Sequence, residues 1–89
     1  MAGPVKRSVM IAGHATSVSL EPVFWDALKR AAEADLLPIS ALVARIDAER
    51  IAAADPVNLA SAIRVWLMED AQRRLVGFHT GIGERATSD

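Results

Sequence analysis

The residues before and after Pro22 follow two different periodicities, and this switch constrains the fold more than any other feature of the sequence. From Ser17 to Leu20, polar and apolar residues alternate one by one, which is typical of a half-buried β-strand. After Pro22, apolar residues recur every three to four positions, which is typical of amphipathic helices. The sequence therefore predicts a short strand that leads directly into a helical region.

The segment before this strand has two interpretations. Val9 and Ile11 also alternate with their neighbours, and Gly13 and His14 between the two halves can form a turn. Residues 8–20 are therefore expected to form either a β-hairpin or one longer strand, and the sequence alone does not separate these alternatives.

Three amphipathic helices are expected after the strand. The first covers residues 22–34, because Pro22 suits the first turn of a helix. The second begins at Pro38 and ends near Glu49 or Ile51, and the third follows Asn58, a good N-cap, and ends near Arg74. The apolar residues at helical spacing are Phe24, Ala27, Leu28 and Ala31, then Ile39, Leu42, Val43 and Ile46, and finally Leu59, Ala62, Ile63, Trp66 and Leu67.

These elements divide the chain into three parts. Residues 1–7 form a basic N-terminal arm, residues 8–75 form the folded domain, and residues 76–89 form a disordered tail, because glycines and small polar residues without a period begin at Gly77. A chain of 89 residues builds only a small core, so a partner subunit is expected to supply further burial.

Composition excludes several classes of function. Aromatic residues make up only 4% of the chain, which favours helices over an all-β fold, and cysteine is absent, which excludes disulfides and thiolate metal sites. The serines lie in no nucleophile motif, and there is no glycine-rich phosphate loop. We therefore expect a protein that is not an enzyme and uses neither a cofactor nor a metal. We also expect it to be cytoplasmic, because no apolar run approaches the roughly 18 residues of a membrane span.

Charge is distributed unevenly along the chain. The net charge is −1, but Lys6 and Arg7 are the only charged residues before Glu21. All acidic residues follow position 20, where they outnumber the basic ones. Positive potential is therefore expected at the N-terminal end of the chain.

A specific string of residues accompanies this arrangement of elements. It comprises Lys6-Arg7-Ser8-Val9, Ile11, Gly13-His14, Thr16-Ser17, Leu20-Glu21 and Phe24-Trp25, followed later by Asn58-Leu59 and Ser61-Ala62-Ile63-Arg64-Val65. In this string the chain resembles the ribbon-helix-helix (Arc/MetJ-like) family, and within it a bacterial subfamily that adds a third helix. The resemblance covers about residues 6–72.

The resemblance implies a homodimer that binds double-stranded DNA and regulates transcription. In this family two subunits pair one strand each into an antiparallel ribbon that enters the major groove, because a single short strand is not stable alone, and the start of the second helix lies near a phosphate. The residues that would contact DNA are Lys6, Arg7, His14, Ala15, Ser17, Ser19 and Ser40. The residues that would form the dimer core are Val18, Leu20, Phe24, Leu28, Leu42, Val43 and Ile46.

The chain departs from the family pattern at two places. Ala15 occupies an outer strand position where the subfamily usually has Arg, which implies weaker sequence readout. Leu36 and Pro38 stand where the family typically has Gly and a Ser or Thr. The alternatives are an antitoxin-like or adaptor module that binds a protein partner, and a sensor for a small anion held near Lys6, Arg7 and His14. His14 itself is interpreted as a turn residue rather than a metal ligand or a base.

Overall fold

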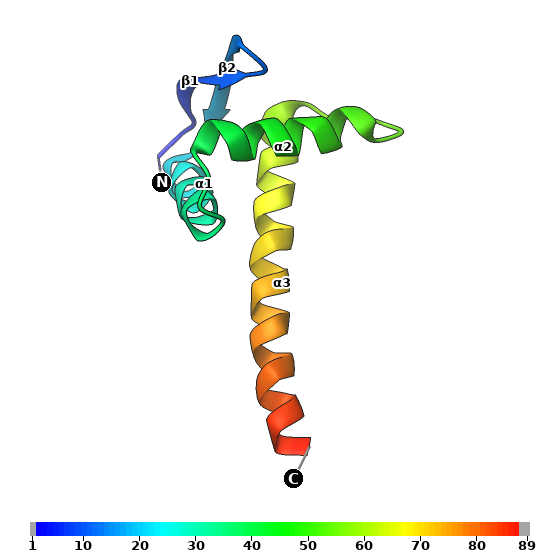
Figure 1. Cartoon of the computed structure of the whole chain (residues 1–89). Coiled ribbons are helices and arrows are strands. Elements are labelled where there is room, and N and C mark those ends of the chain that lie inside the picture. The colour runs from blue at the N-terminus through cyan, green and yellow to red at the C-terminus, as the bar shows by residue number, and fades with distance from the viewer. Residues whose placement is uncertain (1, 88–89) are drawn as a thin grey trace.

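The computed structural model describes the backbone of residues 2–87 and the side chains of residues 2–77. Strands β1 (Val5–Ile11) and β2 (His14–Leu20) precede helices α1 (Pro22–Ala34), α2 (Ile39–Ala52) and α3 (Leu59–Thr87). The hairpin, α1 and α2 gather around the first half of α3, and the second half of α3 extends away from them (Figure 1). The expected fold class, mainly helical with an N-terminal β-ribbon, is confirmed.

The two strands pair with each other within the chain. They are antiparallel, in a register that places Val5 opposite Leu20 and Ile11 opposite His14. The two residues between them, Ala12 and Gly13, have φ angles of 50° and 82°. A two-residue turn with two positive φ angles matches the twist of the flanking strands, and glycine adopts such a conformation without strain. Of the two interpretations of residues 8–20, the hairpin is therefore the correct one.

The hairpin changes two expectations from the sequence. Lys6 and Arg7 were expected in an arm before the domain, but both belong to β1. The alternating strand was expected to need a strand from a second subunit, because a single strand is not stable alone. Its partner is β1 of the same chain, so strand pairing by itself does not require a dimer.

A hydrophobic core lies between the hairpin and the three helices. In α1 the indole of Trp25 is buried while Phe24 is only half-buried, and the Trp25 indole N–H donates a 2.9 Å hydrogen bond to the carbonyl of Val5. This bond holds α1 against the start of β1. The other buried residues are Val9, Val18 and Leu20 of the hairpin, Leu28, Ala31 and Ala32 of α1, Leu42, Val43 and Ile46 of α2, and Ile63 and Leu67 of α3.

The turn between α1 and α2 keeps a geometry that usually requires glycine. The backbone N–H of Leu36 bonds to Glu33 and that of Leu37 bonds to Ala32, the two bonds of a Schellman motif. Leu36 has a φ of 57° and its side chain is 91% exposed. The left-handed conformation is therefore retained although a leucine, not a glycine, occupies the position.

Helix α3 begins as predicted and ends later than predicted. The Asn58 side chain accepts a 2.8 Å hydrogen bond from the Ser61 backbone N–H, which confirms Asn58 as the cap. The helix continues past Arg74 to Thr87. Glycine costs only about 1 kcal/mol at a helix interior position, whereas proline, which would end the helix, is absent from this segment. The side chains of residues 78–89, His79 among them, lie outside the described residues, so the expectation that residues 76–89 take no part in the folded domain stays a prediction.

One polar contact ties α3 to the hairpin and α1. The Arg64 Nε donates a 3.0 Å hydrogen bond to the Glu21 carboxylate, and the Arg64 guanidinium lies 5.7 Å from the Phe24 ring centre. The pKa of Glu21 is lowered, first by a hydrogen bond from its own backbone N–H and then by Arg64. Arg64 therefore links three elements at the junction where the strand meets the first helix. None of the described helices is both long and apolar enough to cross a membrane.

Candidate nucleic-acid interface

The hairpin has an inner face in the core and an outer face turned to solvent. Residues opposite each other in an antiparallel pair share a face, so the pairs alternate between the two. Val9 and Val18 are buried on the inner face, while Ser19 is half-buried and the rest of the outer face is exposed. What we call the hairpin outer face consists of the pairs Lys6–Ser19, Ser8–Ser17 and Met10–Ala15. This face carries one base and no acid.

Four of the predicted DNA-contacting residues lie together on the hairpin outer face. These are Lys6, Ala15, Ser17 and Ser19. The alternation of the sequence placed Ala15, Ser17 and Ser19 opposite to Val18 and Leu20, whereas Lys6 was expected in the N-terminal arm. Sequence reasoning missed Ser8 and Met10, because β1 was left open as an alternative. Their signal was available, since both alternate with Val9 and Ile11.

Arg7 lies on the other face of β1 from Lys6. Its guanidinium stacks on the indole of Trp25, 5.3 Å from the ring centre. Arg7 and Trp25 line a shallow hollow together with Asp26 and Lys29 of α1 and Ile39, the first residue of α2. The hollow brings two cations next to the start of α2, and its one carboxylate, Asp26, is paired with Arg30. Lys29 was not predicted to contact DNA, because in the sequence it stands out only as a polar residue of the first helix.

The two remaining predicted contact residues lie at opposite ends of the ribbon region. His14 is the first residue of β2, exposed beside the turn and paired with Ile11, which puts it on the same face as Val18. Ser40 is the second residue of α2 and is half-buried. It follows Ile39 of the hollow, at the end of α2 where the helix dipole is positive.

The residues predicted for a dimer core are already buried within one chain. Leu20, Leu28, Leu42 and Val43 have no exposed surface, and only Phe24 of the predicted set remains half-buried. Val18 and Ile46 are also buried. Their role in an interface with a second subunit stays a prediction.

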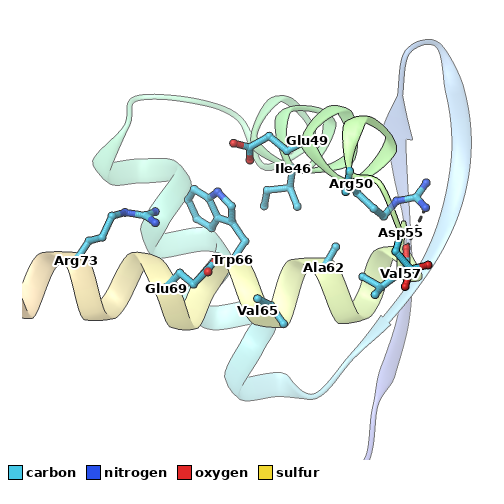
Figure 2. Close-up of a pocket in the computed structure, with 11 residues that line it drawn as sticks. Ile46, Glu49, Arg50, Asp55, Val57, Ala62, Val65, Trp66, Glu69 and Arg73 are labelled. Carbon is cyan, nitrogen blue, oxygen red and sulfur yellow. Dashed lines mark hydrogen bonds between the residues drawn. The ribbon is translucent and has the colours of Figure 1, made fainter.

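A groove lies between α2 and the first half of α3, and it differs in chemistry from the hairpin. Its floor is apolar, with Ile46 from α2 and Ala62, Val65 and Trp66 from α3. Figure 2 shows the Trp66 indole reaching from α3 toward Ile46, with Arg73 extended toward it. The Arg73 guanidinium lies 5.9 Å from the Trp66 ring centre. The charged residues that line the groove are Glu49, Arg50, Asp55, Glu69 and Arg73. We call this surface the α2–α3 groove.

Neither region resembles a catalytic or metal centre in the part of the chain whose side chains are described. No group of three or more potential metal-ligating residues occurs there. Each of the Arg50 and Arg73 guanidinium groups lies within hydrogen-bonding distance of a carboxylate, of Asp47 and Asp70 respectively. Both regions are suited to binding rather than to catalysis. The hairpin presents hydroxyl and cationic groups, and the groove presents an apolar surface.

A two-stranded ribbon followed by helices, with a polar outer face on the ribbon, defines the ribbon-helix-helix class. The ribbon-helix-helix domain family matches residues 4–71, and the chain belongs to this family. No curated protein and no solved structure gives a significant match to the chain. The family fold is a DNA-binding one, typically non-catalytic, generally dimeric, and found in transcription regulators and antitoxins.

Proposed function

We propose that this chain is a transcriptional regulator that binds DNA by placing the hairpin outer face in the major groove. The single observation that carries the proposal is the composition of that face, where Lys6, Ser8, Ser17 and Ser19 stand without any acid. A carboxylate here would be repelled by the phosphates that flank the groove. The major groove of B-DNA is wide enough to admit a two-stranded ribbon.

The side chains on this face suit base edges of several kinds. A serine hydroxyl both donates and accepts hydrogen bonds, so Ser8 and Ser17 can contact different bases with little discrimination. Ala15 and Met10 form an apolar pair near the turn, and apolar groups contact the methyl group of thymine. The proposal therefore includes modest sequence selectivity rather than the strict guanine reading that an arginine would provide.

The proposed phosphate contacts come from the flanks of the ribbon. Lys6 reaches out from the outer face itself, at the end of the hairpin away from the turn. Arg7 and Lys29 share the hollow at the start of α2, where Ser40 and the helix dipole add to the attraction for an anion. Asp26 also lines this hollow, but its charge is offset by the ion pair with Arg30. Phosphate contacts of this kind fix the position of a protein on the duplex without reading its sequence.

A second candidate function is a protein-interaction module, antitoxin-like or adaptor-like, with weak or no DNA binding. One observation favours it: Ala15 occupies an outer position, so the face lacks a side chain able to bind guanine through two hydrogen bonds. The two candidates differ in whether the hairpin outer face is needed for binding to any duplex.

Fluorescence anisotropy with a labelled duplex from the promoter of the protein's own gene separates the two candidates. We expect salt-dependent binding by the wild type, and its loss in the Ser17→Glu, Ser19→Glu double variant, because two carboxylates would face the phosphates. The Lys6→Ala variant should bind all duplexes more weakly, with the slope of log affinity against log salt reduced by about one unit per chain.

A matched control tests whether an added carboxylate weakens DNA binding only when it lies on the hairpin outer face. The Ala34→Glu variant adds a carboxylate at the exposed last residue of α1, at the other end of that helix from β2, and should bind DNA like the wild type. If the wild type ignores both its promoter and random duplexes at low salt, the DNA-binding proposal fails and the interaction module takes its place.

A further inference from the structure

The hairpin outer face changes in chemistry along its length. Two of its three pairs carry polar groups, namely Lys6–Ser19 and Ser8–Ser17. The third pair, Met10–Ala15, lies next to the turn and is apolar. Met10 is 57% exposed, Ala15 is exposed as well, and the turn end of the hairpin projects away from the helices (Figure 1). Apolar atoms therefore remain in water on a face that is otherwise polar.

Met10 and Ala15 form one continuous patch, which we call the Met10–Ala15 patch. Residues directly opposite each other in an antiparallel pair have Cβ atoms about 4.5–5.5 Å apart, so the two side chains are neighbours. The turn residues Ala12 and Gly13 add no polar side chain, and His14 belongs to the other face. Within the hairpin, this end of the outer face therefore has no side-chain hydrogen-bond donor, and its one acceptor is the weakly accepting sulfur of Met10.

The patch lies on a face of the sheet and not at an edge. The sheet has two strands, so one edge of β2 is unpaired. A strand that joins this edge extends the sheet sideways and leaves both faces accessible, because side chains point out of the plane of the sheet. The patch thus stays exposed when two copies pair their strands, and its role has to come from what the outer face contacts.

The major groove offers one kind of apolar group to such a patch. All four bases present hydrogen-bonding groups there, and thymine also presents its C5-methyl group. Alanine and other apolar side chains contact this methyl group, and the contact removes apolar surface from water. 5-Methylcytosine carries its methyl group on the same ring carbon. Either of these two pyrimidines therefore offers the patch a matching surface.

The patch is not equipped to distinguish thymine from 5-methylcytosine. The two bases differ at the neighbouring ring position, where thymine has the O4 acceptor and cytosine has the N4 amino donor. Discrimination between an acceptor and a donor requires a polar side chain, and the pair of Met10 and Ala15 supplies only a weakly accepting sulfur. The methyl group is thus the feature of the base to which the patch responds.

We propose that the Met10–Ala15 patch recognises the C5-methyl group of a pyrimidine, so that thymine and 5-methylcytosine are bound alike and in preference to uracil and cytosine. The inference rests on the proposed function, because it requires the hairpin outer face to lie in the major groove. It adds a property that the proposed function does not contain, since methylation of cytosine would strengthen DNA binding by this protein.

Fluorescence anisotropy with matched duplexes tests the proposal. The promoter duplex of the protein's own gene is compared with one in which uracil replaces every thymine, and single replacements then locate the thymine that is contacted. At that position the pyrimidine is made thymine, uracil, 5-methylcytosine or cytosine in turn. We expect affinity to fall about fourfold when the methyl group is removed, both from thymine and from 5-methylcytosine, as burial of one such group predicts.

Two variants assign the effect to the patch. The Met10→Ser, Ala15→Ser double variant should bind the methylated and unmethylated duplexes equally, because little apolar surface remains to cover the methyl group. Ser17→Ala changes the neighbouring pair, so it should alter the affinity for all four duplexes by one common factor and leave both methyl preferences as in the wild type. Circular dichroism verifies that the double variant is folded, as expected for exposed positions. Should it unfold, Met10→Gln is measured instead, because glutamine keeps the length of the side chain.

The outcomes separate this proposal from the proposed function. A wild type that binds the duplexes without a methyl preference, or a preference that persists in the double variant, overturns methyl recognition by the patch and leaves DNA binding standing. A preference for thymine over uracil without one for 5-methylcytosine over cytosine also overturns it, because the base and not the methyl group would then be recognised. A wild type that binds none of the duplexes at low salt overturns both proposals.

Discussion

The hairpin outer face and the α2–α3 groove are both exposed, yet their side chains differ in chemistry. The hairpin presents hydroxyls and a lysine on a thin ribbon, with no acid among Lys6, Ser8, Ser17 and Ser19. The groove presents Trp66, Val65 and other apolar groups between charges of both signs. A surface rich in small polar groups suits a hydrated, negatively charged ligand, whereas an apolar surface gains free energy only when another apolar surface covers it.

The difference teaches that net charge is a poor guide to this molecule. The overall value of −1 is the sum of a basic ribbon and a more strongly acidic helical region. Because charges farther apart than about 10 Å are largely screened at 0.1 M salt, each surface acts through its own local charge. The chain can therefore carry a DNA-facing and a protein-facing surface at once.

The largest expected effect comes from a substitution in the hydrophobic core, which supports both regions. Leu20 is fully buried at the end of β2, so Leu20→Asp places a charge in the core without a partner. We expect a loss of about 4 kcal/mol or more in the free energy of unfolding, enough to unfold the chain and abolish DNA binding and dimerisation together. Thermal melts by circular dichroism measure this. The neighbouring Ser19→Asp variant, on the outer face, should melt close to the wild type.

A gain of function at the hairpin would sharpen the contrast between the two regions. Ala15→Arg restores a side chain that can bind guanine O6 and N7 together, and should tighten binding to guanine-containing duplexes by about 1–3 kcal/mol. Replacing guanine by 7-deazaguanine in the probe should remove most of that gain. His14→Arg adds the same charge one residue earlier on the inner face, and should give only a non-specific, salt-sensitive increase. An equal gain from both variants would contradict the assignment of faces.

The junction between the two regions offers a smaller, pH-dependent effect. The pKa of Glu21 is lowered by its backbone hydrogen bond and by Arg64, so the ionised carboxylate stabilises the folded chain. This contribution is present above the ordinary glutamate pKa of about 4.3 and disappears as the pH falls through the lower folded value. Glu21→Gln should therefore lower the melting temperature by a few degrees at most at pH 7, and by less at pH 3. A difference that stays constant between these pH values would show that ionisation is not involved.

The smallest effect is expected at the end of α3. Truncation after Val76 removes residues whose composition, rich in glycine and small polar groups, predicted no part in folding. The melting temperature should remain nearly unchanged. A large drop on truncation would show that Phe78 or Ile82 packs against the rest of the protein.

The helical part of the fold could be predicted because its signals are local. Pro22 marks the start of α1, and Asn58 caps α3 as its side-chain chemistry indicates. The end of α3 was not predictable in the same way, since Gly77 weakens a helix without ending it. Leu36 shows the converse: the chain adopts a left-handed turn that its sequence does not favour, because the Schellman hydrogen bonds and the packing of α1 on α2 fix it there.

The candidate sites were predictable only in part. The alternation around Val18 placed Ser17 and Ser19 on the outer face without any tertiary information. The sequence could not show that β1 pairs with β2, because the turn that joins them requires a positive φ at Ala12, which a non-glycine residue rarely adopts. The groove could not be predicted, because Val65 looks like an ordinary core residue until the body of the chain is seen to cover the other side of α3.

The strand pairing inside the chain also has a consequence for the order of events during synthesis and at low abundance. When the ribbon of a dimer is shared, folding waits for an encounter between two chains, and dilution unfolds the protein. Here the hairpin closes over a two-residue turn, a local event that takes microseconds. Strand pairing in a newly made copy therefore does not have to wait for an encounter with a second chain.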